Sequence, residues 1–203
     1  MPEVFRELLS REFAPHVRLS SLQLDRLEDH FDLLQLWNAR MNLTRIRKNE
    51  LVVTLHYCES LYLGTLLPPG KLKIADVGSG AGFPGIPLAV LRPECEITLI
   101  ESHQRKAVFL REAARKLRNV RVSATRAEEV EEAFDWVVSR AVSPSEVMAL
   151  RFAPNLALLI GEEDARQLVG WKTVPLRWGR GRVAALNSVP RETVDGIVPR
   201  ATC

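Results

Sequence analysis

The chain has 203 residues, of which 46% are hydrophobic and 26% charged, and its formal net charge is +3. This is the composition of an ordinary globular protein, long enough for one well-packed α/β domain with a smaller appendage. The sequence contains no apolar run of about 18 residues, no signal-peptide core at its start and only three scattered cysteines, Cys58, Cys95 and Cys203. We therefore expect a cytoplasmic protein with reduced thiols and without a membrane span, a disulfide framework or a metal site.

The first 68 residues are expected to form an N-terminal helical segment. Apolar residues recur at helical spacing over residues 4–13, and Ser20 or Ser21 can cap a longer helix with an apolar stripe. A third helical stretch is expected over residues 51–67, where the Pro-Pro-Gly sequence that follows ends it.

Residues 69–203 are expected to form a separate domain in which strands and helices alternate. The strand-like runs are KLKIADV, EITLIE, VRVSAT, FDWVVS and NLALLI, and the helix-like segments between them are IPLAVLR, KAVFLREAARKL, AEEVEEA and PSEVMALRF. Such alternation predicts an α/β fold with a parallel sheet covered on both faces. The last two strand-like runs, WKTVPLRW and RVAALNSV, are separated by Gly-Arg-Gly and predict an antiparallel hairpin at the end of that sheet.

The stretch DVGSGAGFPG joins the first predicted strand to a helix and contains Gly78, Gly80 and Gly82. Glycines in this position permit positive φ angles and a close approach of the backbone to a ligand. A P-loop is excluded because no Gly-Lys-Ser/Thr follows, and a dinucleotide fingerprint would need its third glycine where Phe83 stands. Glu101 ends the second strand-like run, 23 positions after Gly78, where a carboxylate can accept both hydroxyls of an unphosphorylated ribose. The loop therefore predicts a site for a nucleoside-bearing ligand that need not carry a pyrophosphate.

Basic residues gather in two stretches of the sequence. Eight lie between Arg105 and Arg126, against Glu112 as the one acid, and four lie between Arg40 and Lys48. Either group alone is as well explained by a solvated helix face. Two such groups beside a cofactor loop favour a polyanionic partner, because lysine and arginine neutralise phosphates and release counterions.

The glycine stretch and several short motifs elsewhere in the chain together resemble those of the bacterial 16S ribosomal RNA guanine-N7 methyltransferases, a family formerly called glucose-inhibited division protein B. The matching pieces are Asn42-Leu43-Thr44, His56 to Ser60, Asp76 to Gly85, Arg126-Ala127-Glu128 and Ser139-Arg140-Ala141. The resemblance implies a Rossmann-like class I methyltransferase domain over residues 69–203, with a seven-stranded sheet whose last strand is antiparallel. It also implies transfer of a methyl group from S-adenosylmethionine to N7 of one guanine, guanine-527, of 16S ribosomal RNA, by a monomeric enzyme.

The resemblance further implies which residues contact S-adenosylmethionine. The predicted cofactor-binding residues are Gly78, Gly80, Gly82, Phe83, Ala127, Glu128 and Arg140, and Glu101 is the expected ribose partner. Ala127 and Glu128 follow the third strand, where an adenine could be read. Arg140 could pair with the methionyl carboxylate or with an RNA phosphate.

Guanine N7 has no proton to lose, so its methylation can proceed by direct displacement on the sulfonium methyl group. Alignment and desolvation then supply the catalysis, and no general base is required. We accordingly expect no firm catalytic residue, and we expect Arg140 and His56 to position the substrate.

The sequence departs from the family pattern after about residue 155. The strand that usually ends in Lys-Gly reads LLIGEED, and Glu59 stands where aspartate is commoner. Two alternatives therefore stay open: a methyltransferase that acts on another RNA base, a protein or a small molecule, and a non-catalytic RNA-binding protein that retains the fold.

Overall fold

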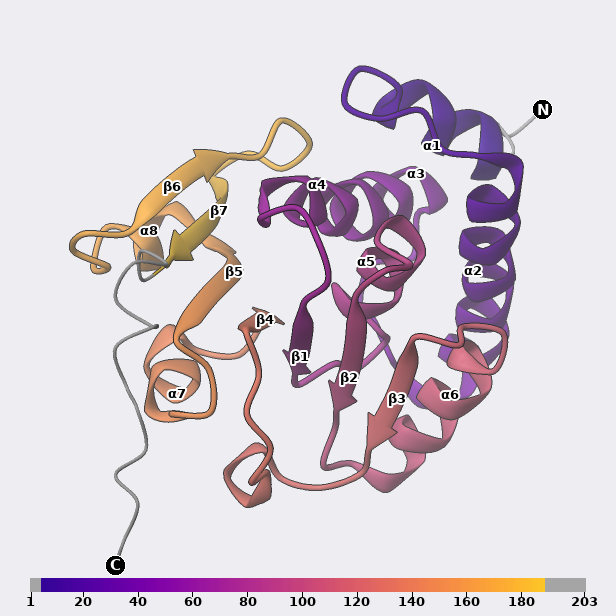
Figure 1. Ribbon diagram of the computed structural model, residues 1–203. Coiled ribbons are helices and arrows are strands. Elements are labelled where there is room, and N and C mark those ends of the chain that lie inside the picture. The colour runs from indigo at the N-terminus through magenta and orange to yellow at the C-terminus, as the bar shows by residue number, and fades with distance from the viewer. Residues whose placement is uncertain (1–4, 189–203) are drawn as a thin grey trace, which may run out of the picture.

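The computed structural model describes residues 5–188. A seven-stranded sheet with the order β3-β2-β1-β4-β5-β7-β6 lies at its centre (Figure 1). Its strands are β1 (Lys73–Val77), β2 (Glu96–Ile100), β3 (Val120–Ser123), β4 (Trp136–Arg140), β5 (Asn155–Gly161), β6 (Lys172–Pro175) and β7 (Arg182–Asn187). The strands β1 to β5 run parallel to one another, whereas β7 is antiparallel to both β5 and β6. The mixed sheet with its antiparallel hairpin confirms the predicted fold class.

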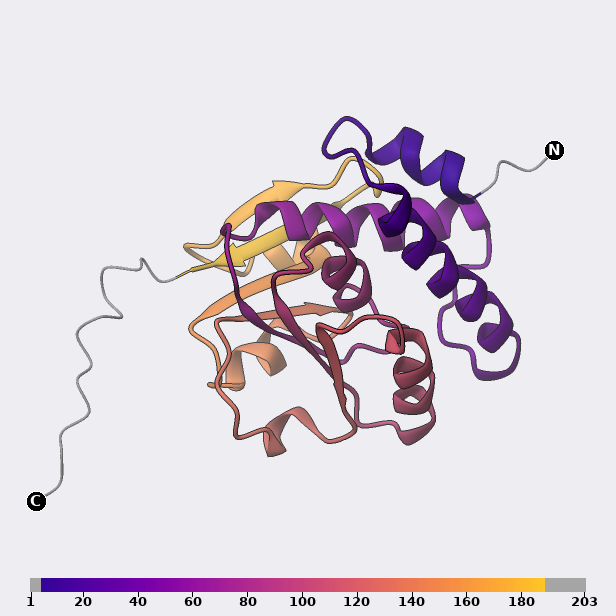
Figure 2. The same cartoon turned by 45° about the vertical axis from the view of Figure 1, so that its right-hand side comes forward.

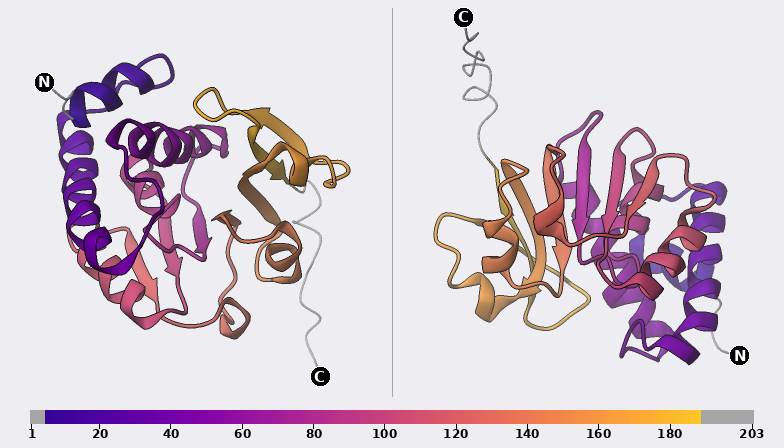
Figure 3. Two further views of the ribbon diagram at one scale, coloured as in Figure 1. Left: turned by 180° about the vertical axis from the view of Figure 1, so that it is seen from behind. Right: turned by 90° about the horizontal axis from the view of Figure 1, so that it is seen from below.

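One face of the sheet is covered by the N-terminal helices together with two helices of the sheet domain (Figures 1 and 3). These are α1 (Phe5–Phe13), α2 (Ser21–Met41), α3 (Asn49–Leu51), the π-helical segment η1 (Val52–Cys58), α4 (Glu59–Leu66), α5 (Gly85–Leu91) and α6 (Gln104–Ala114). Their buried side chains and those of alternate strand residues form one continuous core. The boundary predicted after residue 68 falls between α4 and β1, and the division into two domains stays a prediction. None of the described helices is both long enough and apolar enough to span a bilayer.

The opposite face is covered by shorter elements, namely α7 (Pro144–Ala149), α8 (Glu162–Ala165) and the 3-10 turn η2 (Ala127–Glu129). The expectation of a helix over residues 127–133 was wrong, because only the single turn η2 forms there. A longer helix would bring several glutamates together at three- and four-residue spacing, where like charges repel. Glu132 instead pairs with Arg121 and, at 3.9 Å, with Lys73.

Helix α2 packs against α5 and α6, and it ends near the edge of the sheet at which the parallel strands end. Ser20 caps it as predicted: the Ser20 hydroxyl accepts from the Gln23 N–H and the Gln23 side chain accepts from the Ser20 N–H. Asn42 ends the helix in the left-handed conformation, with φ of +50°. Figure 2 shows α2 beside α6, and the end of α2 meets the beginning of α6.

Candidate functional site

The loop after β1 is shaped by three glycines with positive φ. The angles are +70° at Gly78, +53° at Gly80 and +86° at Gly82, a region that side-chain-bearing residues rarely adopt. The Gly78 N–H donates to the Ile100 carbonyl oxygen at 3.0 Å, which ties the loop to β2. A Cβ atom on Gly78 would lie 2.6 Å from a methyl carbon of Val142. Gly78 itself is exposed, so its backbone is open to a ligand.

Glu101 closes this loop from the end of β2. One carboxylate oxygen accepts from the Gly80 N–H at 2.9 Å and the other accepts from the His103 N–H at 2.8 Å. The carboxylate is buried and fixed by these two backbone groups, while each oxygen keeps a further lone pair for a hydroxyl group. The arrangement fits the predicted ribose partner and also orders the glycine loop.

His30, on α2, supports the loop from the helical side and was missed in the sequence. Its Nε2 lies 3.0 Å from the Ala81 carbonyl oxygen and its Nδ1 lies 2.9 Å from the Tyr57 hydroxyl. A neutral ring satisfies both partners if Nε2 donates to the carbonyl and Nδ1 accepts from the hydroxyl. Burial lowers the pKa of His30 to about 4, which keeps the ring neutral near pH 7. The position of His30 within the apolar stripe of α2 was the one signal that could have found it.

Exchanging His30 for glutamine is expected to change how stability depends on pH. Unfolded histidine titrates near pH 6.5, whereas folded His30 titrates near 4, so between these values the unfolded wild type binds more protons than the folded one. The wild type's stability advantage over His30→Gln should therefore shrink by about 1.4 kcal/mol for each pH unit as the pH falls from 6.5 to 4.

Urea unfolding of both proteins across this range measures that difference. The quantity to compare is the difference in unfolding free energy between the two proteins at each pH. Burial raises the pKa of Asp76 to about 7, so protonation of Asp76 stabilises both proteins as the pH falls through the same range, and the difference removes this contribution. Gln35→Ala, on the same helix and without a titratable side chain, is the matched control and should leave the profile unchanged. Parallel profiles for wild type and His30→Gln would contradict the prediction.

Phe83 and His56 lie in an aromatic cluster below the loop. Their rings stack with centroids 4.7 Å apart, and Tyr57 meets the Phe83 ring edge-on at 5.0 Å. His56 Nε2 lies 2.8 Å from the Thr44 hydroxyl, which joins the Asn42-Leu43-Thr44 motif to this cluster. Burial, and then the nearby guanidinium groups, lower the pKa of His56 to about 3. Contact of Phe83 with a cofactor stays a prediction.

Arg140, at the end of β4, belongs to a buried ionic cluster. Its Nη1 lies 3.6 Å from a carboxylate oxygen of Glu59 and donates to the Leu55 carbonyl oxygen. The Arg182 Nε lies 2.8 and 2.9 Å from the two Glu59 oxygens. Glu59 is fully buried, and desolvation lowers the pKa of Arg140 to about 10. Arg182 was missed in the sequence because it lies in the hairpin, far along the chain from the motifs.

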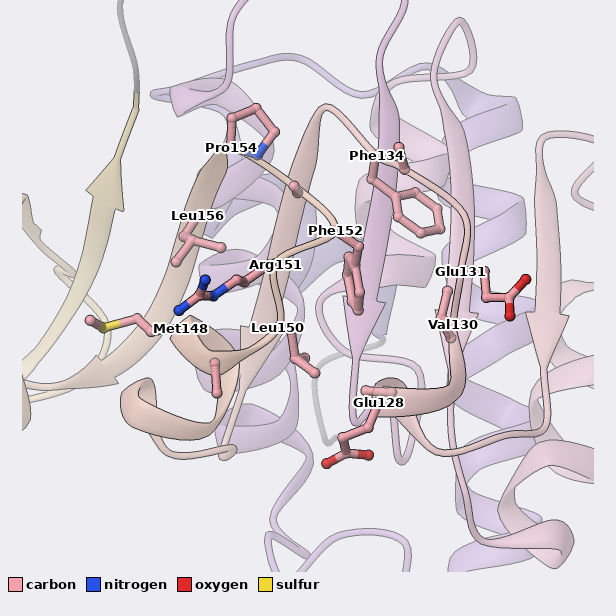
Figure 4. Close-up of a pocket in the computed structure, with 14 residues that line it drawn as sticks. Glu128, Val130, Glu131, Phe134, Met148, Leu150, Arg151, Phe152, Pro154 and Leu156 are labelled. Atoms are coloured by element: carbon pink, nitrogen blue, oxygen red, sulfur yellow. The ribbon is translucent and has the colours of Figure 1, made fainter. Parts of the chain in front are cut away.

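Ala127 and Glu128 line a cavity of about 850 Å³, and Figure 4 shows Glu128 at one end of it. The cavity lies on the sheet face that α7, α8 and η2 cover. There the rings of Phe134 and Phe152 meet edge-on, with their centroids 5.5 Å apart. None of the glycines of the loop lines this cavity. The structure therefore distributes the predicted site residues over three neighbourhoods: the loop with Glu101, the cluster around Arg140 and His56, and the η2 turn. Among the residues that the structure describes, no group of three or more histidines, cysteines or acids is placed to hold a metal ion.

Residues 23–160 match the family model described as rRNA small subunit methyltransferase G. The chain belongs to this family. The rRNA small subunit methyltransferase G of Dichelobacter nodosus is 41% identical over 150 residues, which are 72% of this chain and 68% of the relative. That of Roseiflexus sp. is 34% identical over 207 residues, with 95% of this chain and 87% of the relative covered. The resemblance inferred from the glycine stretch is thereby confirmed.

Solved structures support the fold of this family member. A SAM-dependent methyltransferase from Aquifex aeolicus aligns with a TM-score of 0.52 and 14% identity, covering 67% of this chain and 91% of that one. The 23S rRNA methyltransferase ErmE aligns with a TM-score of 0.50 and 16% identity, covering 63% of this chain and 65% of its own. At such identities the likeness concerns the class I methyltransferase fold alone.

In this family member, some basic residues of the two stretches 40–48 and 105–126 form ion pairs and others do not. Arg115 lies 3.6 Å from Glu112, and Lys116 lies 2.8 Å from Asp29. Arg40 and Arg105 line one pocket instead, and neither has an ion pair within residues 5–188.

Proposed function

We propose that the protein transfers the methyl group of S-adenosylmethionine to N7 of a guanine, guanine-527, in the 16S ribosomal RNA of the small subunit. The observation that carries this proposal is the glycine loop held by the Glu101 carboxylate at the ends of β1 and β2. This arrangement suits a ribose-bearing ligand without a pyrophosphate, and it occurs in a chain that belongs to an rRNA methyltransferase family.

The loop fits S-adenosylmethionine because the Gly78 backbone is exposed to a ligand and no side chain can stand there, since a Cβ atom would lie 2.6 Å from Val142. In this proposal Glu101 accepts the ribose hydroxyls, and the Ala127 N–H and the Glu128 carboxylate recognise the adenine. Arg140 binds the methionyl carboxylate or an RNA phosphate, since its Nε and Nη2 have no hydrogen bond within the described residues. Phe83 walls the site from the core, and His56 holds the Thr44 loop near the substrate.

Bound S-adenosylmethionine would supply a methyl group on a positively charged sulfur: a bond from the N7 lone pair to the methyl carbon would form as the carbon–sulfur bond breaks, the neutral thioether of S-adenosylhomocysteine would leave, and the positive charge would pass to the methylated guanine without loss of a proton. The protein's share is then alignment and exclusion of water. The buried, neutral His56 is consistent with a site that needs no general base. Arg140 is held in place by Glu59, so its charge is oriented before a ligand binds.

The test is methyl transfer from labelled S-adenosylmethionine to 30S subunits that lack the modification. Label is expected in 16S ribosomal RNA, at a single guanine that becomes sensitive to borohydride and aniline cleavage. Glu101→Gln should weaken cofactor binding and slow transfer, whereas Glu96→Gln, at the exposed start of the same strand, should not. Label in protein or on another base would reject the proposed substrate.

We also propose that the enzyme acts as a monomer in the cytoplasm. A ribosomal substrate supports the location, and the family resemblance supports the monomer. Sedimentation of the purified protein at micromolar concentration tests the second point.

A further inference from the structure

A pocket of about 430 Å³ lies between the end of α2 and the beginning of α6, and the proposed chemistry does not use it. We call it the α2–α6 pocket; it is lined by Leu36, Trp37, Arg40, Met41, Arg105 and Val108. Leu36 is 63% exposed and Val108 is 51% exposed, so two large aliphatic side chains border the opening of this pocket. Exposed apolar side chains around a hollow indicate a surface that something covers.

The apolar part of the α2–α6 pocket is suited to a flat ring. The Trp37 indole meets the Phe109 ring edge-on at 5.6 Å, so the core fixes its orientation. Its remaining surface lies beside the aliphatic chains of Leu36 and Val108. Proteins hold unpaired nucleobases by stacking them on such an indole face.

The charge of the α2–α6 pocket points to a polyanion. Arg40 and Arg105 are both exposed, neither has an ion pair within the described residues, and no acid lines the pocket. Nearer the start of α2, Asp29 pairs with Arg26 at 3.7 Å and with Lys116, just after α6, at 2.8 Å. Arg40 and Arg105, at the end of α2 and the start of α6, are thus two cations beside one pocket without an ion pair in the described part of the chain.

The α2–α6 pocket is also connected to the site through the chain. Arg105 lies in the first turn of α6, four positions after Glu101. Met41 is followed by the loop whose Thr44 hydroxyl contacts His56. The pocket therefore lies next to the carboxyl end of β2 and to the loop that holds Thr44 against His56.

We propose that the α2–α6 pocket binds an unstacked nucleotide of the 16S ribosomal RNA near the target guanine. Its base lies against Trp37, and Arg40 and Arg105 contact the flanking phosphates. This inference rests on the proposed function, which it deepens by adding a second point of RNA contact. A ribosomal protein could cover the same surface, and the experiments below distinguish that case.

The first experiment removes both charges with Arg40→Gln/Arg105→Gln. KM for 30S subunits is expected to rise about tenfold, with kcat and the affinity for S-adenosylmethionine unchanged, and the salt dependence of RNA binding should become shallower. The matched control is Arg18→Gln/Arg118→Gln, because both residues are exposed, lie just before the starts of α2 and β3, and line neither this pocket nor the cavity beside Glu128. An unchanged KM would overturn the inference while leaving the proposed function intact.

The second experiment tests the apolar contact. Leu36→Ser should raise KM several-fold, whereas Leu22→Ser, on the same helix and 61% exposed, should not. A single-stranded oligoribonucleotide should quench tryptophan fluorescence in the wild type, and most of the quenching should disappear in Trp37→Phe, which keeps a packed ring. Quenching that persists in Trp37→Phe would overturn the stacking contact, whether or not the wild type transfers methyl groups.

The third measurement separates RNA from protein as the partner. The affinity of Arg40→Gln/Arg105→Gln for deproteinised 16S ribosomal RNA should fall together with its affinity for 30S subunits. A defect confined to the 30S subunit would assign the pocket to a ribosomal protein and overturn the inference. If the wild type binds RNA through this pocket but transfers no methyl group to it, the proposed function fails on its own.

Discussion

Replacing Glu59 by glutamine is expected to lower the free energy of unfolding by about 3 kcal/mol. Glu59 is fully buried and accepts from Arg182 through both oxygens, with Arg140 3.6 Å away. Without its charge, two guanidinium groups that are largely removed from water lose their counterion. Urea unfolding at pH 7, followed by tryptophan fluorescence, gives the change as a shift of the midpoint at constant slope.

The control for this prediction is Glu132→Gln, which removes a carboxylate that pairs with Arg121 at the surface. Exposed ion pairs contribute about 0–1 kcal/mol, so this variant should remain close to the wild type. A double variant Glu59→Gln/Arg182→Gln should be less destabilised than the sum of its single changes, because it also removes one of the two guanidinium groups that lose their counterion. A loss in Glu59→Gln no larger than in Glu132→Gln would show that the cluster does not hold the hairpin to α4.

The secondary structure was largely predictable because its signals are local. The run EITLIE contains β2 (Glu96–Ile100), and Ser20 marks the start of α2 through a capping box that involves only Gln23. The helix predicted over residues 127–133 does not form, because its glutamates would repel one another at three- and four-residue spacing, and Glu132 instead lies beside Arg121 and Lys73. The apolar spacing of residues 51–67 predicts a continuous helix but gives no sign that Val52–Cys58 is π-helical.

The candidate site was predictable to the extent that its residues follow one another at fixed spacing. Glu101 lies beside the glycine loop and accepts from the Gly80 N–H, because neighbouring parallel strands end at the same edge of the sheet. Its contact with a ribose stays a prediction. Arg182 and Glu59 are 123 positions apart, and His30 and Ala81 are 51 apart. Such pairs arise from the packing of helices on the sheet, which no local pattern encodes.

Replacing Gly78 by valine is expected to weaken the binding of S-adenosylmethionine about 100-fold or more, a loss of at least 2.7 kcal/mol. The φ angle of +70° is poorly accessible to a β-branched residue, and a Cβ atom there would lie 2.6 Å from Val142. The loop must shift, and with it the backbone that the Glu101 carboxylate orders for a ligand. Isothermal titration with S-adenosylmethionine measures the effect directly.

The matched control is Gly170→Val, which separates backbone strain from the loss of the site. Gly170 has φ of +82°, but no atom lies within 4 Å of its Cβ position, and it precedes β6 rather than lining the loop. Both variants carry a left-handed β-branched residue, so the backbone strain alone should cost each about 1–2 kcal/mol of stability, to which Gly78→Val adds the clash with Val142. Only Gly78→Val should lose cofactor affinity. Binding retained within about tenfold in a folded Gly78→Val protein would remove the glycine loop as the cofactor site, and with it the observation on which the proposed function rests.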